Sequence, residues 1–222
     1  MSNRSLLLFS FIFALPCNLL AQTASIQVQV YDQAGMDPST LQRFVERTQD
    51  VLITAGLSAE VSTCTRGIED PCAPKTGSAR RLQIRLLARS PKRTSDAGHH
   101  PLGESFADHD GGTYASVFLD RVTDAASGAT VPMVIVLAHA AAHEIGHLLL
   151  GDEAHTPGGL MKAQWDRNDF QAMYQNRLHF TAEQHRILTY RYGVSRPATV
   201  AQNPDLQDHT EVRRQLFCVA PD

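Results

Sequence analysis

Two histidines and a glutamate lie within five consecutive residues in the second half of the chain. The stretch reads HEIGH over residues 143–147, inside an apolar segment whose composition predicts a helix over 131–150. Residues four apart on a helix share a face one turn apart, so His143 and His147 can direct two imidazoles at one point. Zinc suits such a pair, with Zn–N bonds of about 2.0–2.1 Å. Glu144 lies one step around the helix, where its carboxylate can accept a proton from water activated by the metal.

The apolar character of this helix favours a metal site over two histidines that are simply hydrogen-bonded in the core, because buried polar groups are costly unless they bind something. His139 lies one turn before His143, and therefore about 12 Å along the helix axis from His147. That distance is too long for both to bind one tetrahedral ion, so we expect His139 to pack or to support a ligand. A membrane span is the competing interpretation of the segment, and its ionisable side chains make that costly.

We expect the third metal ligand in the chain that follows the helix. Gly151 can adopt the left-handed conformation that ends a helix and turns the backbone, and His155 follows it. Glu153 is the alternative third ligand, since carboxylate oxygens also bind zinc, and Asp152 is a more remote one. We favour His155 because imidazole suits zinc.

These residues resemble the zinc site of the metzincin clan of peptidases, whose signature is H-E-x-x-H-x-x-G-x-x-H followed by a methionine turn. The segment HTPGGLM at 155–161 is similar to the matrixin form of that turn. The chain also resembles small uncharacterised secreted bacterial proteins with a related helix and turn. The resemblance implies zinc held by His143, His147 and His155, Glu144 as the general base, and Met161 as the hydrophobic support below the metal.

The chain departs from the clan signature in the connector between the second and third ligands. Three residues separate His147 from Gly151, and three more separate Gly151 from His155. The clan signature has two residues in each of these places. Glu153 therefore stands at the register of the clan's third ligand. The spacing from His155 to Met161 matches the matrixin turn, which favours His155.

The elements that must position these residues follow from the hydrophobic periodicity and the turn residues. Strands are predicted at 25–31, 57–64, 81–87 and 113–119, and helices at 38–55, 131–150, 166–176 and 181–192, with a polar loop over 90–110. With the resemblance, they indicate an α+β fold of zincin or metzincin type. We expect a twisted mixed sheet of about four strands packed on two long helices, and a small helical C-terminal subdomain after the methionine turn.

The first 21 residues are typical of a secretory signal peptide. Arg4 precedes an apolar run over 6–15, and cleavage is expected after Ala21. The chain then divides into a signal peptide at 1–21, a zincin-like catalytic domain at 22–195 and a tail at 196–222. This predicts a secreted or periplasmic protein, where disulfides persist.

Three cysteines remain after the predicted cleavage. Cys64 and Cys72 enclose a short loop and are the natural disulfide pair. Cys218 is then free or paired elsewhere.

Composition limits the classes of partner. The 222 residues are 43% hydrophobic with a formal net charge of -3, and no Lys/Arg cluster stands out. We therefore expect no nucleic-acid partner, no membrane association after signal cleavage, and a monomer. The expected substrate is a peptide or protein and the expected cofactor is Zn²⁺. The alternatives are a non-catalytic zinc-binding protein and a hydrolase of a non-peptide amide or ester on the same fold.

Other candidate residues give weaker signals. A second metal could bind in the polar loop, although a solvated loop is the better interpretation. Its candidate ligands are His99, His100, Asp108, His109 and Asp110. Trp165 is expected to pack. Three tyrosines could donate a hydrogen bond to a reacting oxygen, but helix packing is the simpler interpretation: Tyr174, Tyr190 and Tyr192.

Overall fold

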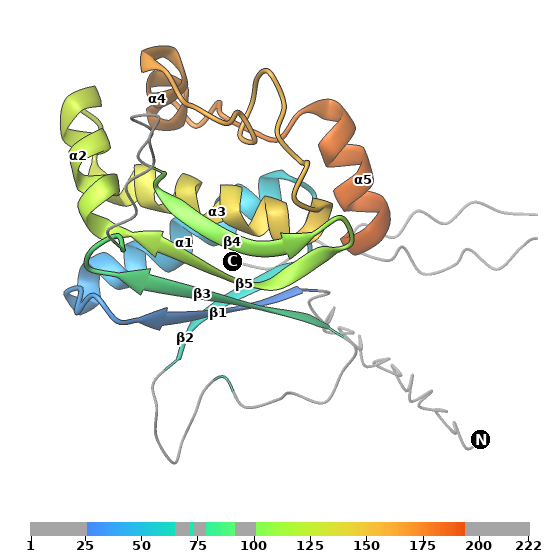
Figure 1. The fold of residues 1–222 in the computed structure, drawn as a ribbon, viewed down its shortest axis with the longest axis horizontal. Helices are drawn as coiled ribbons and strands as arrows, with labels where there is room; N and C mark the ends of the chain where they lie inside the picture. The colour runs from blue at the N-terminus through green and yellow to red at the C-terminus, as the bar shows by residue number, and fades with distance from the viewer. Residues whose placement is uncertain (1–25, 65–71, 73–78, 92–100, 194–222) are drawn as a thin grey trace, which may run out of the picture.

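The computed structural model describes residues 26–64, 72, 79–91 and 101–193 (Figure 1). It has a mixed α+β fold with a five-stranded sheet and five helices. The strands are β1 (Ile26–Asp32), β2 (Ala59–Thr63), β3 (Arg80–Leu87), β4 (Gly103–Asp108) and β5 (Gly111–Phe118). The helices are α1 (Pro38–Thr54), α2 (Leu119–Ala129), α3 (Met133–Leu150), α4 (Arg167–Tyr174) and α5 (Ala182–Tyr192).

The sheet is mixed, with strand order β2-β1-β3-β5-β4. β1 pairs in parallel with β2 and β3, and β3 pairs in parallel with β5. β4 pairs only with β5 among the described strands, and it runs antiparallel, with a register shift between Phe106 and Ala107. β4 is therefore one of the two edge strands, and it contacts α3.

The hydrophobic core lies between one face of the sheet and the two longest helices. Inward positions alternate along the strands, as at Leu82, Ile84 and Leu86 of β3, which are fully buried. α1 and α3 pack on this face and on each other, and Figure 1 shows both on the same side of the sheet. α4 and α5 follow along the chain and also contact α3. The helix that carries the histidine pair is thus enclosed by the sheet, α1 and the C-terminal helices.

Local sequence accounts for the start of α1 and the end of α3. α1 begins after Asp37, whose carboxylate accepts from the backbone N–H of Thr40, with Pro38 at the first helical position. α3 ends at Gly151, which has φ of +102°. A Cβ there would also lie 2.7 Å from the backbone oxygen of His109. Only glycine meets both the conformation and the close approach.

Two elements were not predicted from the sequence. The polar loop expected over 90–110 is wrong at 103–108, where β4 forms. β4 is a short edge strand whose side chains are mostly polar and half exposed, so it lacks a clear alternation. α2 has no side-chain cap, and its buried positions are few, Val122 and Ala126. Both elements depend on tertiary contacts more than on local signals.

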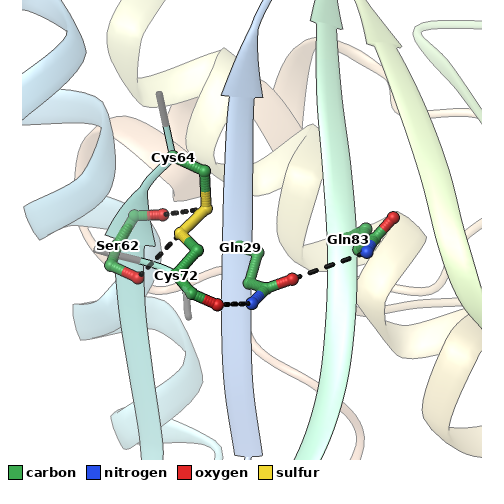
Figure 2. Close-up of a disulfide and its surroundings, with 5 residues drawn as sticks. All are labelled: Gln29, Ser62, Cys64, Cys72 and Gln83. Carbon is green, nitrogen blue, oxygen red and sulfur yellow. Dashed lines mark hydrogen bonds between the residues drawn. A yellow bond between two sulfur atoms is a disulfide. The ribbon is translucent and has the colours of Figure 1, made fainter. Parts of the chain in front are cut away.

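The predicted disulfide is confirmed. Cys64 and Cys72 are joined across eight residues, as Figure 2 shows. The backbone oxygen of Cys72 accepts from Gln29 Nε2 at 2.8 Å, and Gln29 Oε1 in turn accepts from Gln83 Nε2 at 3.5 Å. These hydrogen bonds run from Cys72 to β1 and on to β3, and so attach Cys72 to the sheet.

Several predictions concern parts of the chain outside the described residues. The signal peptide at 1–21, the tail at 196–222, Cys218 and the histidines 99 and 100 all lie there. The domain boundaries stay predictions. Among the described residues, α3 alone is long and apolar enough to span a membrane by length and composition, and 72% of it is buried inside the protein. That burial is typical of a core helix.

Candidate metal centre

The structure brings three imidazoles together. Nε2 of His155 lies 3.1 Å from Nε2 of His147 and 3.3 Å from Nε2 of His143. For Zn–N bonds of about 2.0–2.1 Å at the tetrahedral angle, two ligand nitrogens are about 3.3–3.4 Å apart. Both distances from His155 match an edge of a zinc tetrahedron, and all three ligand atoms lie within 4.8 Å of one another.

The hydrogen bonds of the helical pair leave their Nε2 lone pairs free for a metal. Nδ1 of His143 lies 2.8 Å from the backbone oxygen of Leu160, and Nδ1 of His147 lies 3.2 Å from that of Gly151. A carbonyl can only accept, so each Nδ1 carries the proton. Each neutral ring then directs a lone pair from Nε2 toward Nε2 of His155. That nitrogen carries at most one hydrogen, so the lone pairs of the two helical rings are available to a shared cation.

Burial keeps these rings neutral. Desolvation lowers the pKa of His143 to about 4, and the neighbouring imidazoles of His147 and His155 add to the effect. The hydrogen bond to Leu160 opposes it. The pKa of His147 is also lowered, again chiefly by burial. Both rings are therefore unprotonated at neutral pH, as metal ligands must be.

His155 reaches the group from residues 154–161, a segment of irregular backbone and turns that we call the third-ligand arm. The backbone N–H of Thr156 donates to the oxygen of Met161 at 3.0 Å, which closes the arm on itself. The N–H of Leu160 donates to the oxygen of His179 at 2.7 Å. The arm is thus held against the segment that leads into α5. His155 itself is exposed, so the cluster opens toward solvent on this side.

Met161 lies directly against α3. Its side chain is fully buried, and a Cβ added to Gly146 would lie 2.3 Å from its sulfur. Gly146 stands between the two helical histidines, so the absence of a side chain there is what admits the methionine. The supporting role that the resemblance implies for Met161 stays a prediction.

The side chain of Glu144 points toward β4. The side chain is 7% exposed, and a Cβ on Gly103 of β4 would lie 2.7 Å from its Oε1. Burial raises the pKa of Glu144 to about 8, and the charge of Glu104 adds to this, while a hydrogen bond from the Ser105 side chain opposes it. A carboxyl group with a pKa near neutrality can both accept and return a proton.

The other candidate residues fall outside the three-nitrogen group. Glu153 and Asp152 are exposed in the connector, and the group contains His155 in their place. His139 is 1% exposed, with Nδ1 2.8 Å from the backbone oxygen of Ile135, and burial lowers its pKa to about 4. It packs in the core as expected.

A second group of possible metal ligands lies where β4 ends and the chain turns into β5. Asp108, His109 and Asp110 could together hold an ion, but all three are exposed. His109 Nε2 lies 3.2 Å from Asp110 Oδ2 on the surface. The solvated interpretation of these residues is the simpler one.

The expected packing of the tyrosines is wrong for two of them. Tyr174 is 57% exposed and Tyr190 is 90% exposed. The hydroxyl of Tyr192 accepts from Arg80 Nη1 at 3.4 Å, and the guanidinium lies 5.8 Å from the ring centre. That contact joins α5 to β3.

Sequence reasoning missed three residues that support the site. Trp165 does more than pack, because its ring lies 5.5 Å from that of His143 and its indole N–H donates to Leu160, the carbonyl that also holds His143. Gly103 and Ser105 contact Glu144 from β4, a strand that was not predicted. No local pattern could have identified Gly103 and Ser105, since their contacts depend on the pairing of β4 with β5.

Comparison with known proteins finds similarity to solved structures but no similarity in sequence to a family or a curated protein. No protein-family model and no curated protein matches the sequence. Archaemetzincin from Methanopyrus kandleri is 15% identical with a TM-score of 0.49, and the match covers 78% of this chain and 98% of that one. Metalloproteinase-II from Bacteroides fragilis is 14% identical with a TM-score of 0.42, covering 77% of this chain and 54% of that one. This chain thus spans about half the length of the second protein. At this similarity, the functional assignment rests on the residues of the metal centre.

Proposed function

We propose that the protein is a zinc-dependent endopeptidase with His143, His147 and His155 as the metal ligands. The observation that carries this is the convergence of three Nε2 atoms, two of them with their Nδ1 protons fixed by carbonyls. Three protein ligands leave the fourth position of a zinc site open, which is typical of catalytic sites and not of structural ones. A non-catalytic zinc site would gain nothing from a buried glutamate beside two of the ligands.

A bound zinc ion would supply Lewis acidity, which acidifies water and polarises a substrate carbonyl. The residues of the chain supply the proton transfer. Glu144 accepts a proton from the attacking water and returns it to the leaving amine. Its burial against Gly103 holds the carboxylate in one place and excludes bulk water, and beside a cation it ionises more readily than its raised pKa alone suggests.

A peptide substrate is favoured by the edge strand next to Glu144. β4 has no partner on its outer side among the described strands, and its residues Gly103 and Ser105 contact the glutamate. An extended chain can add to such an edge by main-chain hydrogen bonds, which would align a peptide bond beside Glu144. A small amide or ester would make no use of this edge.

The predicted location and partners belong to the same proposal. A signal peptide at 1–21 would deliver the protein to the periplasm or the outside of the cell, where the Cys64–Cys72 disulfide is stable. The partner we propose is a peptide or protein substrate, acted on by a monomer.

The test is hydrolysis of a pool of quenched fluorescent peptides by the zinc-loaded chain, beside its Glu144→Gln variant. The variant keeps the size and hydrogen-bonding capacity of the side chain but cannot take up a proton. We expect both proteins to bind one zinc and the variant to be slower by about 10²–10⁴-fold, the usual contribution of a general base. Equal rates would contradict the role of Glu144. Zinc binding without cleavage by the wild type would favour the non-catalytic alternative or a non-peptide substrate.

A further inference from the structure

Gln184, in the first turn of α5, makes one hydrogen bond more than its helix requires. Its side chain is 6% exposed. Its Oε1 accepts from the N–H of Thr181 at 3.1 Å, and its own N–H donates to Thr181 Oγ1 at 3.3 Å, which completes a capping box. A capping box needs only an acceptor at this position, and glutamate serves equally well. The amide nitrogen of Gln184 is therefore available for another partner.

That partner belongs to the third-ligand arm. Nε2 of Gln184 donates to the backbone oxygen of Ala154 at 2.9 Å. Ala154 directly precedes His155, so the bond fixes the peptide group from which the third imidazole extends. On the other side of His155, the N–H of Thr156 is held by the oxygen of Met161. Two hydrogen bonds thus flank the ligand, and only one comes from outside the arm.

His155 depends on this support more than the other two ligands do. His143 and His147 project from a buried helix, and each has an Nδ1 held by a carbonyl. Among the described residues, the ring of His155 hydrogen-bonds only to the other two imidazoles. It lies eight residues after His147, beyond the helix end, so the helix does not fix its position. Its orientation is set by the backbone on either side.

We propose that Gln184 is a positioning residue for the third metal ligand, acting through the Ala154 carbonyl. The proposal rests on the metal site proposed above. Loss of the amide donor would free the N-terminal end of the arm and leave the ring of His155 less well oriented toward the metal. Zinc affinity would fall, although Gln184 does not touch the metal.

The decisive variant is Gln184→Glu. It preserves the size of the side chain and the acceptor of the capping box, and it replaces the donor facing Ala154 with an oxygen. The added negative charge would by itself strengthen the binding of a cation, so weaker binding reports on position. Thr181→Ala is the matched control, because it removes a capping oxygen and leaves the bond to Ala154 in place. Gln184→Leu removes the donor without burying a charge.

The measurements are the zinc dissociation constant, from competition with a chelator, and the visible absorption spectrum of the Co²⁺-loaded chain. We expect Gln184→Glu and Gln184→Leu to bind zinc about 10–100-fold more weakly than the wild type, as for other groups that orient a ligand. Their Co²⁺ spectra should change, while Thr181→Ala keeps the wild-type affinity and spectrum. The effect of Gln184→Glu should also vanish in a His155→Ala background.

Three results would overturn the proposal. Wild-type affinity and an unchanged Co²⁺ spectrum in both Gln184 variants would show that the arm needs no such tether. An equal loss in Thr181→Ala would assign the effect to the helix cap. A loss that persists in the His155→Ala background would show that Gln184 acts elsewhere. If the wild type itself bound no metal, the site proposed above would fail first.

Discussion

The two parts of the metal centre are built in different ways. His143, Glu144 and His147 belong to α3, which is enclosed by the sheet and neighbouring helices, so core packing fixes their relative positions. His155 belongs to the exposed part of the third-ligand arm, which is held by a few hydrogen bonds. Burial therefore fixes the first two ligands, and hydrogen bonds to the backbone fix the third. We expect changes in the exposed part of the arm to alter metal binding with little effect on the fold.

The largest expected effect is the removal of the exposed ligand. His155→Ala should weaken zinc binding by at least about 100-fold, more than the loss of a supporting group does. Because His155 is exposed, the metal-free variant should unfold at the same denaturant concentration as the wild type. Glu153→Ala is the matched control and should keep the wild-type affinity. The opposite pattern in chelator competition would make Glu153 the third ligand.

The next effect concerns the buried half of the site and its pH dependence. The pKa of Glu144 is raised from 4.5 to about 8 in the folded chain, so the folded state holds a proton that the unfolded state has lost. The stability of the metal-free protein should therefore fall as pH rises from about 5 to about 8. Glu144→Gln should remove this loss, which we expect to be about 3–4 kcal/mol, since one pKa unit corresponds to about 1.4 kcal/mol.

Urea unfolding in the presence of a chelator, at several pH values, would measure this difference. The lowered pKa values of His139 and His143 act in the other direction, below about pH 6.5, and they cancel when wild type and variant are compared. A stability difference between the two proteins that does not change from pH 5 to pH 8 would contradict the burial of an ionisable carboxyl group.

A third prediction separates the disulfide from the metal centre. Replacing Cys64 and Cys72 with serine removes a cross-link between residues eight apart, which should cost about 2–3 kcal/mol of stability by the loop-entropy estimate. Since the bond lies at β2 and contacts Gln29, zinc affinity should not change. Calorimetry and chelator competition on the same samples would test this. Weaker zinc binding in the serine variant would connect the two regions.

The smallest expected effect is at the strand that contacts the glutamate. Gly103→Ala places a Cβ 2.7 Å from Glu144 and 2.8 Å from the backbone oxygen of Ser116, so the carboxylate or β4 must shift. We expect the peptidase rate to fall about tenfold, because small displacements of a catalytic group reduce the rate, while zinc stays bound. Gly158→Ala, where a Cβ meets nothing within 4 Å, is the control. Equal rates in both variants would contradict the role of β4.

The sequence predicted the buried half of the centre more completely than its surroundings. The i, i+4 histidines lie on a strongly apolar helix, so periodicity alone identified their shared face, and the helix end at Gly151 followed from its residue type. The cysteine pairing followed from loop length. By contrast, β4 and the contacts of Gly103, Ser105 and Gln184 arise from tertiary pairing between distant segments. Local patterns carry no information about such contacts.

The most direct test of the account is zinc K-edge X-ray absorption of the zinc-loaded chain. We predict three imidazole nitrogens and one further light atom at about 2.0–2.1 Å, the pattern of a site with three histidine ligands and one position open to water. His155→Ala should lose one imidazole from this pattern. Two imidazoles with a carboxylate, or four protein ligands around the metal, would contradict the assignment of the three histidines as an open catalytic site.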